Sequence, residues 1–527
     1  MKEHQHSVHS LSFSKDGKYL ASIGGGTPRK LIIWDIETGR MSCHSKLPIT
    51  VSVVRLYFDT ELYAITARAA LRKEEGIVVD VTFRGNNDLH TWYFNKQSGN
   101  LVSHKCDVGR FQRDVACISV DTLNRNAYVG TTTGDVLVIC LEKSYLKTKS
   151  KPSQNLQGGV TCIATWETDH ILVGSKLGLL HKMKCSSFAI QQSCEVLGGI
   201  TSIARAHDGS FYVGTDKSNI YNVNSHSFIP VLMASNHCHR INGVVFPKNY
   251  SDLFATFSAN DIRLWDGRKL EEALRITVSG NECFALDIAP SGEFILSGWS
   301  DGSTKAFLPQ SGKLYFEVKD SHQNGVTAVA CMSDNSMIVT GGMKGDIRLW
   351  CLETMGCVLQ EIRREHHAKI ILLKLGRKDL KMLSASSDGT IITWDMKTFT
   401  PVRSFQEKSS LKSVALHPDE SLIISAPANQ CISFWNSEGG HKIDELLLDD
   451  YSQHKTLAIS ANGNFILTAG SGGLVRLFDL RSGYPIPLAD GIGSSGTAQG
   501  CAISPDESYA VTVGDGGSMF RWDLIKS

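Results

Sequence analysis

Four side chains in one stretch of the sequence could do chemistry together. His366, Ser384 and Asp388 are the residue types of a nucleophilic triad, in which an imidazole activates a serine hydroxyl. A common setting for such a serine is a G-x-S-x-G turn, and the chain has none. With Trp394, the same residues can instead form hydrogen bonds between neighbouring strands, each worth about 1 kcal/mol net. The sequence favours this structural role over an enzyme with an active site in a channel, so we predict no catalytic residue.

A metal site is the second possibility, at His237-Cys238-His239. Alternate residues of an extended strand point the same way, and imidazole and thiolate groups favour zinc. A closed zinc site needs third and fourth ligands, and none stands at a suitable spacing. A histidine in a loop is the favoured interpretation. The glycine clusters lack the G-x-x-x-x-G-K-[ST] pattern, so we predict neither a metal nor a cofactor.

The composition excludes several classes of partner. Lys plus Arg number 54 against 53 for Asp plus Glu, a net charge of +1, so no bulk field draws the chain to nucleic acid or to a membrane. No stretch reaches the roughly 18 apolar residues of a membrane helix, and Met1 to Ser10 has no apolar h-region, so we expect neither a membrane span nor a secretory leader. The 14 cysteines form no C-x-x-C pair, which is typical of the reduced thiols of a cytosolic protein.

An internal repeat supplies the elements that must position these residues. Aromatic residues close short apolar strands with spacings of 42, 43, 44, 41, 43 and 44 residues from Trp265 onward, and four tryptophans precede an aspartate. A period of about 40 to 45 residues with a Trp-Asp dipeptide is the signature of WD-repeat propellers, which have four strands per blade. The predicted blade-closing aromatics are Trp34, Trp92, Trp265, Phe307, Trp350, Trp394, Trp435, Phe478 and Trp522.

Each repeat also contains two apolar strands joined by a tight turn. Asp208-Gly209, Ser291-Gly292 and Asn462-Gly463 occupy this turn, where glycine provides a positive φ. The unit that ends at Trp350 has His322 and Thr340, but Lys344 stands where the aspartate is expected. We therefore predict an incomplete hydrogen-bond network and a looser blade there.

Twelve repeat units predict an all-β chain of tandem WD-repeat β-propellers, because single rings commonly have 4 to 8 blades. We predict an N-terminal propeller over residues 1–230 with five recognisable blades, and a C-terminal seven-bladed propeller over residues 231–527. The first is an incomplete or truncated seven-bladed ring: open, completed by a partner, or lacking N-terminal blades. Two rings of six blades each are the even alternative, but that division splits the run of best-matching repeat units.

The second unit is longer than the period. Trp34 and Trp92 lie 58 residues apart, and the excess is Leu71 to Asn87. Insertions in repeat arrays form loops, often on a binding face. A partner-contact loop and a plain extended hairpin are both open. The candidate contact residues are Arg72, Lys73, Glu74, Glu75 and Arg84.

Several segments resemble the cilia- and flagella-associated protein 52 family. They include YVGTTTGDVL from Tyr128, QGGVTCIA from Gln157, LGGITSIARAHDGSFYVGTDKSNIY from Leu197, VFPKNYSDLFAT from Val245 and DIRLWD from Asp261. The resemblance runs in order along nearly the whole chain, through middle units that lack the Trp-Asp dipeptide.

This resemblance implies two seven-bladed rings and a structural role in the doublet microtubules of the axoneme. The family acts there as microtubule inner proteins, bound to the luminal wall of the B-tubule near the inner junction. The implied partners are alpha- and beta-tubulin and other inner-junction proteins, with no nucleic acid and no membrane. The implied location is the cytoplasm, in the cytoskeleton of the cilium or flagellum. A general WD-repeat scaffold, associated with actin or microtubules, is the alternative.

Overall fold

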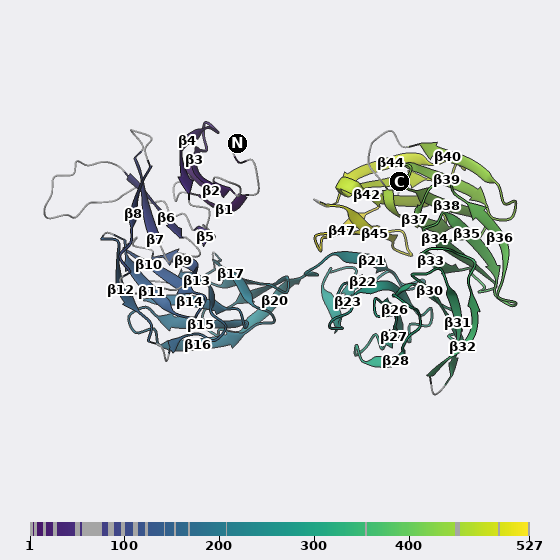
Figure 1. Ribbon diagram of the computed structural model, residues 1–527, viewed down its shortest axis with the longest axis horizontal. Helices are drawn as coiled ribbons and strands as arrows, with labels where there is room; N and C mark the ends of the chain where they lie inside the picture. Colours follow the sequence, from purple (N-terminus) through teal and green to yellow (C-terminus); the bar gives the residue numbers. More distant parts are fainter. Residues whose placement is uncertain are drawn as a thin grey trace. The chain divides into compact units, whose positions relative to one another are not determined.

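The chain forms two compact units, residues 1–234 and residues 235–527 (Figure 1). They are drawn from a computed structural model, in which no described residue belongs to an α-helix. The structure describes residues 4, 8–13, 17–24, 29–47, 53–54, 76–82, 89–95, 101–108, 114–121, 125–141, 143–151, 154–166, 169–206, 208–353, 356–447, 454–493 and 496–524.

The first unit contains five antiparallel sheets of four strands in the described ranges. In chain order the sheets are β1 (Val8–Phe13), β2 (Tyr19–Gly24), β3 (Arg29–Asp35), β4 (Met41–Leu47); β5 (Val53–Val54), β6 (Gly76–Thr82), β7 (Leu89–Asn95), β8 (Leu101–Lys105); β9 (Val115–Val120), β10 (Asn126–Thr131), β11 (Val136–Cys140), β12 (Tyr145–Lys149); β13 (Val160–Trp166), β14 (His170–Ser175), β15 (Leu179–Lys184), β16 (Ile190–Glu195); and β17 (Ile200–Arg205), β18 (Phe211–Thr215), β19 (Asn219–Val223), β20 (Pro230–Ser235).

The second unit contains seven sheets in the described ranges, of which the last has three strands. A single 3-10 turn, η2 (Ser471–Gly473), joins two strands. The sheets are β21 (Ile241–Val245), β22 (Leu253–Ser258), β23 (Asp261–Asp266), β24 (Glu272–Thr277); β25 (Cys283–Ile288), β26 (Ile295–Trp299), β27 (Thr304–Phe307), β28 (Leu314–Val318); β29 (Val326–Cys331), β30 (Met337–Gly342), β31 (Ile347–Glu353), β32 (Gly356–Arg363); β33 (Ile370–Leu375), β34 (Lys381–Ser386), β35 (Thr390–Asp395), β36 (Thr400–Gln406); β37 (Leu411–Leu416), β38 (Leu422–Pro427), β39 (Cys431–Asn436), β40 (Lys442–Leu447); β41 (His454–Ile459), β42 (Phe465–Gly470), β43 (Leu474–Asp479), β44 (Ile486–Ile492); and β45 (Ala498–Ile503), β46 (Tyr509–Gly514), β47 (Met519–Asp523).

The hydrophobic core lies between consecutive sheets. Val339 and Ile347 of one sheet pack against residues of the next, namely Ile370, Met382 and Trp394. Each of these side chains is at most 6% exposed. Both faces of a central strand are therefore buried, as β30 and β34 show along almost their whole length. In the four-stranded sheets from β9 to β44, the fourth strand is mostly exposed or half-buried, and β36 has one buried residue in seven. This explains why the second and third strands read as continuous apolar runs in the sequence.

One irregularity recurs in the register of the sheets. The pairing of the first and second strands shifts at the start of the first strand, as between Ile370 and Leu372 in β33. The same shift occurs between Val160 and Cys162 in β13. A β-bulge at this position increases the local twist and turns the extra residue toward a different side. Thr161 in the first unit is such a bulged residue.

The seven sheets of the second unit follow one another in a closed cycle, from teal β21 to yellow β45 (Figure 1). The last sheet packs on the first through a shared cluster that includes Tyr509, Val511, Phe254 and Trp265. The Tyr509 hydroxyl also donates a hydrogen bond to the carbonyl oxygen of Ser251. The cycle therefore closes by contacts between residues that lie more than 250 positions apart.

Turns between the first and second strands link several neighbouring sheets of the second unit. The Asp379 carboxylate accepts the Ser333 N–H at 2.7 Å, and the Glu420 carboxylate accepts the Arg377 N–H at 2.8 Å. At the closing seam, the Ser251 hydroxyl accepts the Asp506 N–H at 3.0 Å. These bonds join neighbouring sheets along one rim of the unit.

The predicted turn glycines have the expected conformation. Gly209, Gly292 and Gly463 have φ values of 83°, 76° and 82°. The prediction of glycine-type turns at these positions is therefore confirmed. No helix in the described ranges is long and apolar enough to cross a membrane.

Candidate functional site

The structure brings three of the four predicted hydrogen-bonding residues of one sheet together. His366, in the loop before β33, lies 2.7 Å through Nε2 from the hydroxyl oxygen of Ser384 on β34. The indole N–H of Trp394 on β35 donates to the same oxygen at 2.8 Å. Ser384 is fully buried. Its oxygen is shared by two partners and shielded from solvent, which suits a structural residue rather than an exposed nucleophile.

Asp388 reaches His366 only through Thr390. The Thr390 hydroxyl donates to Asp388 Oδ1, so its oxygen is left to accept a hydrogen bond from Nδ1–H of His366. Nε2 must then accept from the Ser384 hydroxyl, which fixes a neutral imidazole. Asp388 also accepts the backbone N–H of His367 at 2.8 Å. The sequence placed the right residues in this sheet but missed Thr390 as the link.

Electrostatics agree with a neutral imidazole in this network. Burial lowers the pKa of His366 to about 4. Burial also pushes the pKa of Asp388 upward, but hydrogen bonds from Thr390 and His367 outweigh it and leave that pKa below its usual value. The two groups therefore keep their forms, neutral and ionised, around neutral pH.

The prediction of an incomplete network next to Trp350 is wrong. His322 Nδ1 lies 2.8 Å from Asp346, and its Nε2 lies 2.8 Å from the hydroxyl of Thr340, which also accepts the indole N–H of Trp350 at 2.9 Å. Asp346 provides the carboxylate that we did not find at Lys344. It lies directly before β31, at the end of the turn and two residues after that lysine.

His237 forms a third network, which the sequence did not reveal. Its Nδ1 lies 2.6 Å from Asp261, and its Nε2 lies 2.6 Å from the Thr256 hydroxyl, to which the Trp265 N–H donates at 2.7 Å. No group of three or more His, Cys, Asp or Glu in the described part of the chain could hold a metal ion. Both ring nitrogens of His237 therefore have hydrogen-bond partners within its own sheet.

A constant spacing could have found these partners. The residue that bonds Nδ1 stands 24 positions after the histidine in all three networks: Asp261, Asp346 and Thr390. Sequence reasoning looked instead for an aspartate at the position of Asp388, two residues earlier. An aspartate does bond the imidazole in two of the three networks, but it stands two residues after the position that we had expected.

Asp261 belongs to a larger buried charge cluster. Arg263, 1% exposed, donates from Nε to Asp261 at 2.7 Å and from Nη1 to Glu272 at 3.0 Å. Its Nη1 also donates to the hydroxyl of Ser235, at 2.7 Å. Burial raises the pKa of Asp261, but His237 and Arg263 outweigh this and leave it well below its usual range. The cluster fixes the first residue of the second unit to β23 and β24.

In other sheets, similar hydrogen bonds hold the closing tryptophan. In the sheet β37–β40, Glu407 takes the place of the histidine and accepts from the Ser425 hydroxyl at 2.8 Å and from the Trp435 N–H at 3.2 Å. In the first sheet, His4 lies 2.7 Å from the Ser22 hydroxyl, which accepts the Trp34 N–H at 2.7 Å. In both sheets, a polar side chain that precedes the first strand is part of the hydrogen-bond network that holds the tryptophan of the third strand.

The predicted blade-closing aromatics all lie on third strands. Seven are buried, namely Trp34, Trp265, Phe307, Trp350, Trp394, Trp435 and Phe478. Trp522 of β47 is half-buried, and Trp92 lies in β7. The proposed contact residues Arg72, Lys73, Glu74, Glu75 and Arg84 lie outside the described residues.

Comparison with known proteins identifies the repeat and the family. The family model "WD domain, G-beta repeat" matches residues 1–35, 313–351 and 399–436. Cilia- and flagella-associated protein 52 of Chlamydomonas reinhardtii is 33% identical over 531 residues, which cover 99% of this chain and 82% of the relative. The chain belongs to the cilia- and flagella-associated protein 52 family.

Relatives of the same name occur in animals. The proteins of Sus scrofa and Homo sapiens are each 30% identical and align with 98% of this chain and 82% of their own length. The family resemblance predicted from the sequence is confirmed. The chain is thus an all-β, cilia- and flagella-associated WD-repeat protein, and its polar networks are the scaffold of its sheets.

Proposed function

We propose that this protein is a structural microtubule inner protein of ciliary and flagellar doublet microtubules. It binds the luminal wall of the B-tubule near the inner junction and stabilises the axoneme. The observation that carries this proposal is the family membership, which extends over 98–99% of the chain. In this proposal each unit is a WD-repeat propeller domain, and the protein resides in the cytoplasm as part of the axonemal cytoskeleton.

A mechanical role suits the architecture. Buried networks join the strands of a sheet, and turn-to-turn hydrogen bonds join several neighbouring sheets of the second unit. A cycle of sheets that is closed by Tyr509 cannot open without exposing a hydrophobic seam. Such a body transmits load between the partners that hold it.

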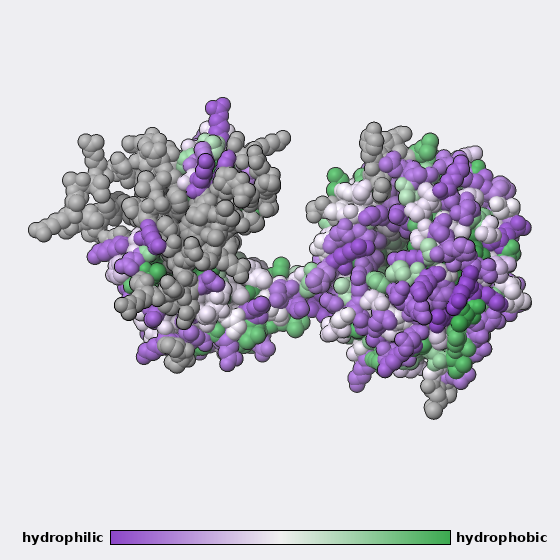
Figure 2. Space-filling view, in the orientation of Figure 1, coloured by the Kyte–Doolittle hydropathy of each residue, from purple (hydrophilic) through white to green (hydrophobic). Residues whose placement is uncertain are grey.

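The surface suits many weak contacts. The face of the second unit seen in Figure 2 is mostly hydrophilic, with a few single hydrophobic residues and one hydrophobic strip at its lower right. The partners we propose are alpha- and beta-tubulin and neighbouring inner proteins. A filament lattice presents these partners at fixed positions, so each contact raises the effective concentration for the next. A net charge of +1 fits a luminal ligand, which has no need of a basic tail.

Extraction of isolated axonemes tests the proposal. A tagged copy of the protein should stay with the doublets when salt removes proteins of their outer surface, and should be released only when the doublets themselves are disassembled. Release with the first salt wash, or co-purification mainly with actin or soluble proteins, would contradict a luminal role and favour a general scaffold.

A further inference from the structure

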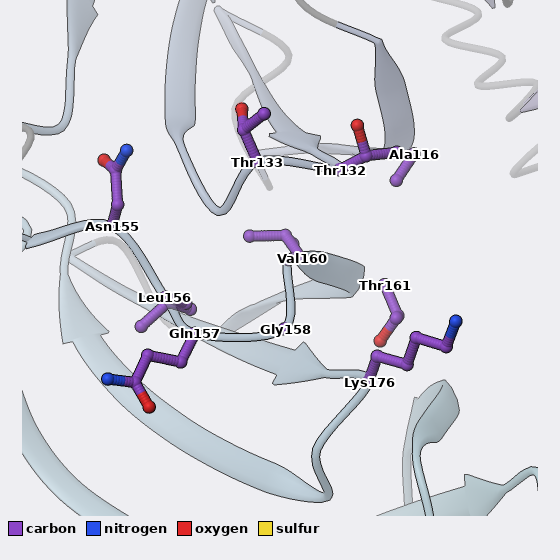
Figure 3. A pocket seen from close by; sticks show the side chains of 11 residues that line it. Ala116, Thr132, Thr133, Asn155, Leu156, Gln157, Gly158, Val160, Thr161 and Lys176 are labelled. Atoms are coloured by element: carbon purple, nitrogen blue, oxygen red, sulfur yellow. The ribbon is translucent and has the colours of Figure 1, made fainter.

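A cavity of about 670 Å³ opens between two sheets of the first unit. Figure 3 shows Thr132 and Thr133, from the turn after β10, on one side and the loop of Asn155 to Gly158 on the other. Lys176, which follows β14, completes the wall. The bulge in β13 adds Thr161 to the lining. The volume falls within the range of about 300–1,000 Å³ that is usual for ligand pockets.

The walls of this cavity are set by backbone rather than by side chains. A Cβ atom on Gly159 would lie 2.4 Å from the carbonyl oxygen of Thr132, and one on Gly134 would lie 2.2 Å from that of Leu156. Both glycines also have a positive φ. The loops therefore approach each other to backbone contact, which fixes the shape of the cavity.

Two polar side chains of the lining have partners within the chain: Thr133 donates to Asp135, and Thr161 donates to the carbonyl oxygen of Gly174. Among the described lining residues Lys176 alone is charged, and it is exposed. No hydrogen bond or ion pair joins its ammonium group to a residue of the described ranges. The side-chain oxygen of Asn155 is shielded from solvent and has no hydrogen-bond partner. Asn155 as a whole is half-buried, but an amide oxygen that is shielded and lacks a donor is a site for an added N–H group.

The next sheet shows what the chain places at the same position. Lys176 is the first residue after β14, and Asp216 is the first residue after β18. The Asp216 carboxylate accepts the N–H of Gly199, just before β17, at 2.8 Å. The sheet that starts with β17 therefore has a carboxylate, that of Asp216, at this position. The sheet that lines the cavity has the ammonium group of Lys176 there instead.

We propose that this cavity binds an Asp or Glu side chain on an extended segment of a partner protein. The carboxylate forms a charge-assisted hydrogen bond with Lys176, and the Asn155 amide bonds the backbone of the segment. The proposal goes beyond the proposed function and does not depend on it, because an acidic segment could belong to a partner inside or outside the doublet.

Binding of a labelled peptide to the full chain tests this site. A short peptide of alternating Glu and Gly should raise the fluorescence anisotropy on binding, and its Gln counterpart should bind at least about tenfold more weakly. Lys176→Gln should weaken binding of the Glu peptide by a similar factor and reduce its dependence on salt, whereas Lys176→Arg should retain most of it. Asn155→Leu should weaken binding without changing the salt dependence.

Lys344→Gln is the matched control. Lys344 is also an exposed lysine on a turn between second and third strands, and it donates to Gln323 at 2.7 Å. This variant should bind the Glu peptide as the wild type does. Equal binding of the Glu and Gln peptides, or equal loss in the Lys176 and Lys344 variants, would overturn the proposal. Full displacement of the peptide by an equal concentration of free glutamate would also overturn it, in favour of a small-anion site.

Discussion

The imidazole of His366 keeps one protonation state around neutral pH because both of its ring nitrogens have a fixed partner. His366 is neutral, with Ser384 on one side of the ring and Thr390 on the other. Protonation would place an Nε2–H donor against the Ser384 hydroxyl, which in the neutral state donates to that same nitrogen. His237 and His322 differ in their surroundings, because Nδ1 of each faces a carboxylate instead of a hydroxyl.

The first prediction concerns pH. The pKa of His366 is about 4 in the folded protein and about 6.5 in the unfolded chain, so below pH 6.5 the unfolded state binds more protons. Stability should therefore be fully present above pH 6.5 and fall by about 3 kcal/mol as the pH drops to about 4. Denaturation at a series of pH values should show this slope. His366→Gln should flatten it, whereas His367→Gln, at an exposed neighbour, should leave it unchanged.

The second prediction concerns the buried arginine. Arg263→Gln leaves Asp261 and Glu272 without their shared cation and should cost about 3–5 kcal/mol of unfolding free energy. Arg268 also pairs with an aspartate, Asp252, but its side chain is 77% exposed. Arg268→Gln should have no measurable effect on the unfolding free energy, because solvent screens this exposed pair. Equal losses in urea denaturation would show that burial does not control these two ion pairs.

At the level of strands and sheets, the apolar pattern predicted much of the fold. The period of two before each aromatic indicated third strands, and Ile262 to Trp265 indeed lie within β23. The tight turns were visible only where glycine marks them. Glu420 and Glu507 adopt a positive φ at equivalent turns without that signal. Their carboxylates bond the preceding turn, a contact between sheets that no local pattern encodes.

Other features depended on contacts between distant segments. Asp346 escaped notice because the sequence pattern identifies a residue type near a turn, whereas the bond depends on which side chain faces the imidazole. The cavity beside Lys176 requires two loops to meet through Gly134 and Gly159. Such an approach is set by the packing of whole sheets, and sequence periodicity does not report it.

The third prediction concerns closure of the second unit. Tyr509 is 3% exposed, and its hydroxyl bonds the carbonyl oxygen of Ser251 across the seam. Tyr509→Phe should keep the packing but lose this bond, which lowers the unfolding free energy by about 1–2 kcal/mol. The same change at Tyr484, which is 67% exposed, should have no measurable effect. Thermal melts of the two variants provide the comparison, and matching melting temperatures would contradict a role for the seam bond.

At the scale of the whole molecule, we propose a stiff body that is held by many partners. The cilia- and flagella-associated family and the closed cycle of the second unit both suit a part of a permanent assembly. Small losses of stability should therefore be better tolerated in the assembly than in the isolated chain, since binding adds to the free energy of unfolding. The position of the protein in that assembly distinguishes a microtubule inner protein from a general WD-repeat scaffold.

A cryo-electron microscopy map of doublet microtubules tests this position most directly. We expect density for the protein on the inner wall of the B-tubule near the inner junction, and loss of that density in doublets from cells that lack the protein. Difference density on the outer surface, or identical maps with and without the protein, would contradict the account.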